Sequence, residues 1–161
     1  MAASTADTVK VPEGYTATPF VPWGTPLFTS GAGAHWKGDG SENAADQARQ
    51  VGDNHDGIHF FPLDGQSNSE GLLVMNHEYT TPLKGGLYLS LFGQPAAPAN
   101  TLDRVDKAIH AWGCSVIHVR QNAAGQWEVV LDSRYNRRLT GSSPMEMTEA
   151  ACVPSAGPSF D

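Results

Sequence analysis

Glycine and proline interrupt this sequence so often that long regular helices cannot form over most of it. The 161 residues include 17 glycines and 11 prolines, and both residue types are frequent in turns and end helices. In residues 1–50, for example, "VPEGYTATPFVPWGTPLFTSGAGAHWKGDG" shows no regular apolar period. The sequence therefore predicts an all-β protein with irregular loops and short helices, which begins with an irregular entry segment over residues 1–50.

Two pairs of strand-like runs follow the entry segment. The first pair is "IHFFPL" (58–63) and "GLLVMNHEY" (71–79), joined by "DGQSNSE". The second pair is "CSVIHVR" (114–120) and "WEVVLDS" (127–133), joined by "QNAAGQ". Apolar and β-branched runs separated by loops of Gly, Asn, Asp and Ser are typical of hairpins. We therefore expect two β-hairpins.

Two stretches have helical character. Residues 44–50, "AADQARQ", consist of residues compatible with a helix and contain no Gly or Pro. Residues 102–112, "LDRVDKAIHAW", have apolar side chains at helical intervals, and Thr101 stands where a helix N-cap is expected. The apolar positions of this second stretch are Leu102, Val105, Ile109 and Trp112. The sequence predicts a short helix in each place.

The charge balance disfavours nucleic acid as a partner. Seventeen acidic and ten basic residues give a formal net charge of −7, and a negative chain is repelled by phosphate backbones. No apolar run approaches the roughly 18 residues needed for a membrane span. The first ten residues, "MAASTADTVK", lack the basic start and apolar centre of an export signal. We predict no membrane span and no nucleic-acid partner.

The two cysteines, Cys114 and Cys152, show no spacing that indicates a disulfide framework or a zinc knuckle. Free thiols are therefore favoured over a single disulfide. Cys114 lies within an apolar strand-like run, where a buried and chemically inert thiol is expected.

The stretch "GDNHDGIHFFPL" (52–63) concentrates polar residues in front of an apolar run. It does not match an EF-hand loop, and Gly57 opposes the helix that would pair His55 with His59 on one zinc ion. On a strand, His55, Gly57 and His59 would share one face. Asn54 and Asp56 could bind a metal, but a hydrogen-bonded polar turn explains the same composition. Both interpretations stay open on this local pattern.

A second polar group, "NHEYT" (76–80), stands at an expected strand end. Asn76 and Glu78 fall on one face of the strand, and their oxygen atoms suit calcium or a mixed transition-metal site. The pattern lacks the second histidine of a zinc-protease helix. A solvated charge at a strand end is the alternative for Glu78.

The stretch "SRYNRR" (133–138) is a basic patch in an acidic chain. Arginine binds phosphate through paired charge-assisted hydrogen bonds, so Arg134 and Arg137 are candidate phosphate ligands. The alternative is a solvated turn whose arginines pair with nearby acidic groups.

The combined order of several phrases resembles a known family. "VPEGYTATPFVPWGTPL", "AADQARQVGDNHDGIHFFPL", "GLLVMNHEYTTP", "GCSVIHV" and "SRYNRRLTGSSPM" together resemble the N-terminal part of PhoX-type bacterial alkaline phosphatases. The resemblance covers roughly residues 8 to 148. It implies a β-propeller that uses calcium and iron to hydrolyse phosphate monoesters and is exported by the twin-arginine route, hence periplasmic or secreted.

Given this resemblance, we expect Asn54, Asp56 and Glu78 near the metal ions and Arg134 and Arg137 near phosphate, because carboxylates and guanidinium groups suit those tasks. The resemblance weakens after about Met147, and family members continue into a segment similar to "CANGQTPWGTYLTCEEN" that supplies metal ligands. We therefore expect an N-terminal fragment that is inactive alone. "AWGCSV" (111–116) also departs from the family's usual "AHGVSV".

These expectations divide the chain into an entry segment (1–50), a partial β-propeller (51–147) and an anomalous tail (148–161). Propeller blades take roughly 40 to 50 residues, so the chain can form about three blades at most and cannot close a ring. Two other functions remain compatible with the sequence. One is a non-catalytic β-propeller-like binding or interaction module, and the other is a calcium-dependent esterase or lactonase on a related propeller.

Overall fold

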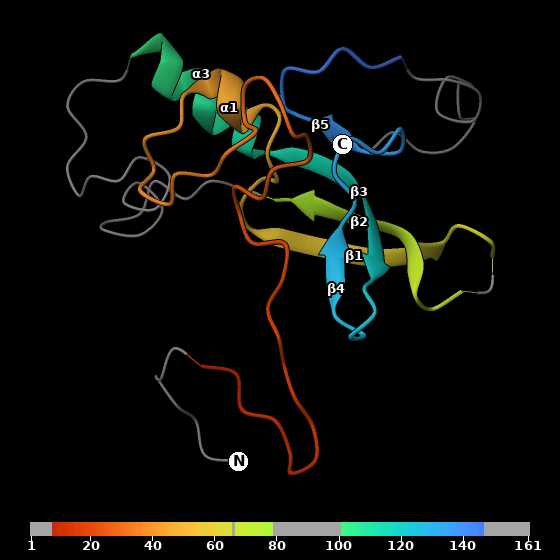
Figure 1. Ribbon diagram of the computed structural model, residues 1–161. Helices are drawn as coiled ribbons and strands as arrows, with labels where there is room; N and C mark the ends of the chain where they lie inside the picture. Colours follow the sequence, from red (N-terminus) through yellow and green to blue (C-terminus); the bar gives the residue numbers. More distant parts are fainter. Residues whose placement is uncertain (1–7, 66, 79–100, 147–161) are drawn as a thin grey trace, which may run out of the picture.

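The computed structural model describes residues 8–65, 67–78 and 101–146, which form an antiparallel sheet with two helices at one end (Figure 1). The strands are β1 (His55–Pro62), β2 (Glu70–His77), β3 (Gly113–Gln121), β4 (Trp127–Val129) and β5 (Arg137–Leu139). The helices are α1 (Ala44–Gln47) and α3 (Leu102–Ala111). Neighbouring strands follow the order β1-β2-β3-β4, and β5 also pairs with β3. The predicted all-β class with short helices is confirmed, and the sheet is open at its edges.

Both predicted hairpins are present, but the last strand is shorter than its apolar run. β4 ends at Val129. The Val130 N–H still donates to the His118 carbonyl at 2.9 Å, but the side chain of Asn136 replaces the return bond from the His118 N–H to the Val130 carbonyl. Asn136 Nδ2 donates to the carbonyls of Leu27 and Val130, at 3.0 and 2.9 Å, and its Oδ1 accepts from the His118 N–H at 2.9 Å. The chain then returns to pair with β3 as β5.

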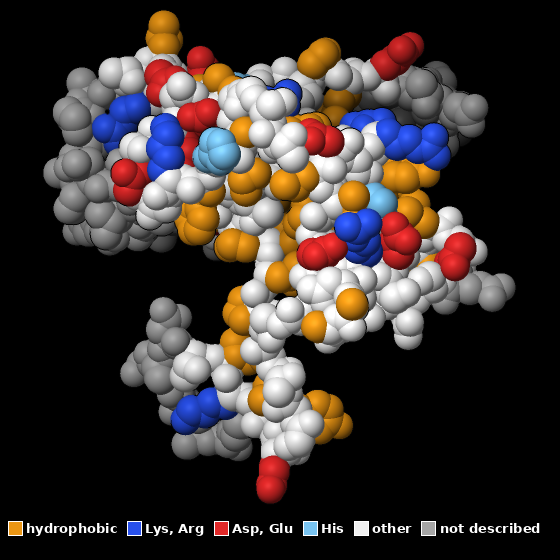
Figure 2. Space-filling model, viewed as in Figure 1, with side chains coloured by type: hydrophobic (Ala, Val, Ile, Leu, Met, Phe, Trp, Pro, Cys, Tyr) orange, Lys and Arg blue, Asp and Glu red, His pale blue; other side chains and the backbone are white. Residues whose placement is uncertain are grey.

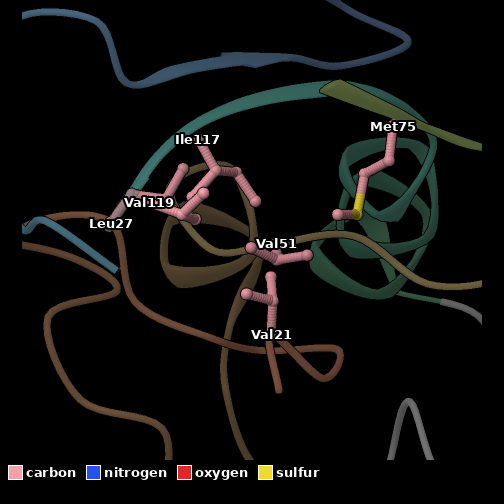
Figure 3. Close-up of a cluster of buried hydrophobic side chains, with 6 residues drawn as sticks. All are labelled: Val21, Leu27, Val51, Met75, Ile117 and Val119. Carbon is pink, nitrogen blue, oxygen red and sulfur yellow. The ribbon is translucent and has the colours of Figure 1, made fainter. Parts of the chain in front are cut away.

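The sheet has two faces, which strand alternation and register define. The inner face carries Met75, Ile117 and Val119, which pack with three residues from the irregular first part of the chain: Val21, Leu27 and Val51. Figure 3 shows Val51 between Val21 and the side chains of β3. Part of the entry segment thus forms one layer of the core. The division into residues 1–50, 51–147 and 148–161 stays a prediction.

A β-bulge in β1 overturns the prediction that His55, Gly57 and His59 share one face. His55 lies opposite His77, whereas His59 lies opposite Val74, so the register shifts by one residue between them. A one-residue bulge moves every following side chain to the other face. His55 therefore belongs to the inner face, and His59 belongs to the opposite, outer face.

Helix α3 forms as predicted, and the Thr101 side chain caps it by accepting from the Arg104 N–H at 3.3 Å. The apolar positions that predicted this helix are largely exposed, however, with Leu102 at 84% exposure. Its buried residues are Lys107 and Ala111. The reason is that α3 packs against α1 through this polar side, where the Ala44 N–H donates to Asp103 Oδ1 at 3.1 Å.

Gly113 permits the close approach of β5 to the start of β3. Its φ is +109°, and a Cβ atom there would lie 2.0 Å from the Leu139 carbonyl oxygen. We expect Gly113→Ala to lower the free energy of unfolding by clearly more than the 1–3 kcal/mol that left-handed strain costs. Gly125→Ala is the matched control, since Gly125 has φ +75° and no atom within 4 Å of its Cβ position. Urea denaturation measures the free energy of unfolding of both variants. Equal losses of this free energy in Gly113→Ala and Gly125→Ala would contradict the role of Gly113 in the close approach of β5 to β3.

Candidate metal and phosphate site

The three predicted metal-binding residues meet at the open end of the β1–β2 hairpin. Asp56 lies opposite Asn76 in the register. Beyond the intervening His55–His77 pair, the Glu78 N–H donates to the Asn54 carbonyl at 3.0 Å. Asn54, Asp56, Asn76 and Glu78 therefore lie in two cross-strand pairs that are separated by one pair, His55 and His77. The sequence pattern alone could not establish this, because it did not fix the register.

The neighbouring Asp53 carries an unusual carboxylate. Its Oδ1 accepts from the Asn54 N–H at 2.8 Å, but its Oδ2 is buried without a hydrogen-bond partner among the described residues. Burial is the main reason why the pKa of Asp53 is raised, and nearby His55 acts against this effect. A buried, unpaired carboxylate oxygen is costly unless a cation or donor meets it. A cation bound next to residues 53–56 would therefore offset the cost of this buried carboxylate.

The donor set suits a hard cation better than a soft one. Carboxylate and amide oxygens are the usual ligands of calcium. Within the described ranges, no group of three or more His, Cys, Asp or Glu residues is arranged to hold a metal ion. These residues therefore fit part of a calcium site, and they do not supply a full set of iron ligands.

A buried histidine supports the hairpin end from the inner face. His77 is 2% exposed. Its Nδ1 lies 3.2 Å from the Asp53 carbonyl, and its Nε2 lies 2.7 Å from Ser115 Oγ. Because a carbonyl only accepts, Nδ1 carries the proton and the Ser115 hydroxyl donates to Nε2. Burial, followed by the positive charge of Arg138, lowers the pKa of His77 to about 3, so the ring is neutral at physiological pH.

The predicted phosphate ligands, Arg134 and Arg137, lie at or next to β5, which is separated from β1 by β2 and β3. Arg137 is exposed in β5, opposite Val116, and thus shares the outer face with Asp56 and Asn76. Its Nη1 donates to the carbonyls of Arg134 and Asn136. Arg134 is also exposed and stacks on the Tyr135 ring, with 4.7 Å between guanidinium carbon and ring centroid. Figure 2 shows Lys and Arg side chains gathered near β5.

Arg138 is an important residue that the sequence did not single out. Its five N–H groups donate to five backbone carbonyls at 2.7–3.0 Å. The acceptors are the carbonyls of Gln50, His110, Trp112, Cys114 and Leu139. Adjacent residues in a strand point to opposite faces, so "RR" could have indicated one inward arginine only if a strand had been expected there.

Cys114 has a free, half-buried thiol next to this arginine. Burial raises the pKa of the thiol, and the positive charge of Arg138 only partly offsets that effect. A thiol with a raised pKa stays protonated and weakly nucleophilic at neutral pH. This agrees with the predicted inert role.

The fold and the site together define an all-β protein with an open sheet and a cluster of oxygen donors at one hairpin end. The family described as "Alkaline phosphatase PhoX" matches residues 1–158. A solved structure, Pseudomonas fluorescens PhoX in complex with vanadate, a transition state analogue, matches with a TM-score of 0.72 and 37% identity, over 86% of this chain. The chain belongs to the PhoX alkaline phosphatase family.

The match with the Pseudomonas fluorescens structure covers 22% of that longer chain. No curated protein matches this chain. In the described residues, no helix is long and apolar enough to cross a membrane.

Proposed function

We propose that this chain is the N-terminal portion of a metal-dependent phosphomonoesterase and is inactive alone. Membership of the PhoX family supports the reaction. The observation that carries the proposed site is the convergence of Asn54, Asp56 and Glu78 at one hairpin end, beside a buried carboxylate oxygen of Asp53. The match covers 22% of the solved relative's chain, which supports the proposal that this chain is a portion of a longer protein.

The proposed roles follow from charge and position. Asp56 and Glu78, with the amide oxygens of Asn54 and Asn76, bind calcium, while iron requires ligands from outside the described residues. When bound, the cations supply positive charge that stabilises the phosphate and activates an oxygen nucleophile. Arg137, on the same face, orients the phosphate oxygens through its guanidinium group, and Arg134 adds positive charge beside it. The proposed location is the periplasm or outside the cell, as the family resemblance implies.

The first test compares the 161-residue chain with a chimera. In the chimera, this chain replaces the matching part of the Pseudomonas fluorescens protein. We expect hydrolysis of p-nitrophenyl phosphate, with calcium and iron added, by the chimera and not by the short chain. A folded chimera without activity would contradict the phosphatase proposal, and metal-dependent activity of the short chain would contradict the proposal that it is inactive alone.

Glu78 provides a direct test of the metal site. Glu78→Ala in the chimera is expected to weaken calcium binding at least about tenfold, because even indirect partners of metal ligands cost that much. Phosphatase activity should fall in parallel. Glu128→Ala is the control, since Glu128 pairs with Arg120 at 2.9 Å on β4, away from the site. Unchanged calcium content in the Glu78 variant, measured by mass spectrometry, would reject Glu78 as a ligand.

A further inference from the structure

Several histidine rings of this protein lie within hydrogen-bond distance of a serine hydroxyl. Three such pairs in the described residues are His77 Nε2 and Ser115 Oγ at 2.7 Å, His110 Nε2 and Ser142 Oγ at 2.8 Å, and His118 Nδ1 and Ser133 Oγ at 2.9 Å. A serine hydroxyl becomes nucleophilic when a neighbouring base accepts its proton and a third group orients that base. The partner of the second ring nitrogen therefore decides which pair can react.

His118 is the member of this set whose second ring nitrogen meets a carboxylate. Its Nε2 lies 2.8 Å from Glu70 Oε1, whereas the second nitrogens of the other two rings face backbone carbonyls. Because a carboxylate only accepts, Nε2 carries the proton and Nδ1 is the acceptor for the Ser133 hydroxyl. Glu70, His118 and Ser133 thus follow the acid, base and nucleophile order of serine hydrolases, with the two ring nitrogens exchanged.

The fold holds this group in place from three elements. Glu70 begins β2, His118 lies in β3, and both point to the outer face of the sheet. Ser133 follows β4 in a turn that the Asn136 N–H closes by donating to the Ser133 carbonyl at 3.0 Å. The Asn136 side chain accepts from the His118 N–H at 2.9 Å, which ties this turn to the histidine. His118 is 8% exposed, so its ring is firmly positioned.

Ser133 is reachable from solvent and has a positive charge nearby. It is half-buried, and the Tyr135 N–H donates to its Oγ at 3.2 Å, which leaves a second lone pair for attack. The exposed Arg134 guanidinium lies over the Tyr135 ring, and this ring stands edge-on to His118 at 5.7 Å between centroids. A positive charge there suits the oxyanion that forms when a carbonyl is attacked. Partial burial of Ser133 favours a small acyl group.

We propose that Ser133, His118 and Glu70 form a second hydrolytic site, which cleaves carboxylic esters of small acyl groups. Ser133 Oγ bonds to the carbonyl carbon while its proton moves to His118 Nδ1. The bond from that carbon to the alcohol oxygen then breaks, and the alcohol leaves with the electron pair and this proton. Water releases the acid from the acyl-serine in the same way and the proton returns to Oγ. Glu70 is a positioning residue that orients the ring and balances the charge of the imidazolium.

The test follows hydrolysis of p-nitrophenyl acetate by the 161-residue chain in the presence of EDTA. We expect release of p-nitrophenolate and an acetyl group on Ser133, located by mass spectrometry of peptides. Ser133→Ala should lower the rate at least about 100-fold. Ser142→Ala is the matched control and should leave the rate unchanged, because the histidine beside Ser142 has a carbonyl on its second nitrogen.

Glu70→Gln tests the positioning role, since half of this side chain is exposed and its replacement should leave the melting temperature unchanged. The rate at saturating ester should fall at least about tenfold, with the half-saturating ester concentration unchanged. Equal rates in Ser133→Ala and the unchanged chain, acetylation of another residue alone, or no hydrolysis above the buffer reaction would overturn the proposal. None of these outcomes depends on metal ions or on phosphatase activity.

Discussion

Replacing Arg138 with methionine is expected to lower the free energy of unfolding by about 3–5 kcal/mol, which is comparable to the whole stability of many small domains. The guanidinium group is largely buried, and burial lowers its pKa to about 10. All five of its N–H groups are satisfied, each by a backbone carbonyl. Methionine has similar length but cannot donate, so several buried carbonyls would lose their partners.

The effect is large because Arg138 joins segments that are far apart in the sequence. Its acceptors come from the end of the loop after α1, from the C-terminal end of α3 and from the start of β3. Gly52 lies against the same guanidinium, since a Cβ atom there would be 2.7 Å from Arg138 Nη2. Loss of Arg138 would therefore also loosen the segment that leads to Asn54 and Asp56.

Arg137→Met is the matched control for this prediction. Arg137 precedes Arg138 in the same strand but is exposed, so its replacement should change the free energy of unfolding by less than about 1 kcal/mol. Arg138→Lys should also be strongly destabilising, because an ammonium group cannot reach five carbonyls in a planar arrangement. Urea denaturation followed by circular dichroism measures all three variants. Equal stability of the Arg137 and Arg138 variants would show that the buried hydrogen bonds contribute nothing.

The second large effect concerns the buried Lys107. Its side chain is 1% exposed, and its Nζ donates to the Gly40 carbonyl at 2.7 Å. Burial lowers the pKa of Lys107 from 10.5 to about 8, although Glu42 and Asp103 act in the opposite direction. Between pH 8 and 10.5 the unfolded chain therefore binds more protons than the folded chain. The contribution of Lys107 to the free energy of unfolding therefore rises with pH across that window, by up to about 3 kcal/mol in total.

Lys107→Met is expected to remove this rise between pH 8 and 10.5. Lys10→Met serves as the control, because Lys10 is exposed and is not among the charges that act on Lys107. Urea denaturation at several pH values measures the slopes. If the Lys107 variant does not fold, the NMR titration of the Lys107 Cε–Hε group in the unchanged chain should show a midpoint near pH 8. A midpoint above pH 10 would contradict the prediction.

Local sequence pattern predicted the elements of this fold well. Both hairpins, the N-cap at Thr101 and the open all-β architecture follow from turn residues, strand-forming runs and capping preferences, which act within a few neighbouring residues. The short β5 was not predicted, because "RRL" has no strand signal of its own and pairs only where β3 offers a free edge.

The candidate site was predicted in its residues but not in its arrangement. Asn54, Asp56 and Glu78 were chosen by residue type, and their convergence depends on the pairing of β1 with β2. The bulge that separates His55 from His59 could not be read from the sequence, since a one-residue register shift leaves the local composition unchanged.

By itself, the sequence determined where the chain turns, which segments are extended, and the family that the ordered phrases resemble. Tertiary structure alone decided which of two adjacent arginines is buried, why α3 turns its polar side inward, and which residues cover the inner face of the sheet. The physical reason is distance along the chain. The contact between Asn136 Nδ2 and the Leu27 carbonyl, for example, joins residues 109 positions apart. Burial at such positions is set by partners that no local pattern contains.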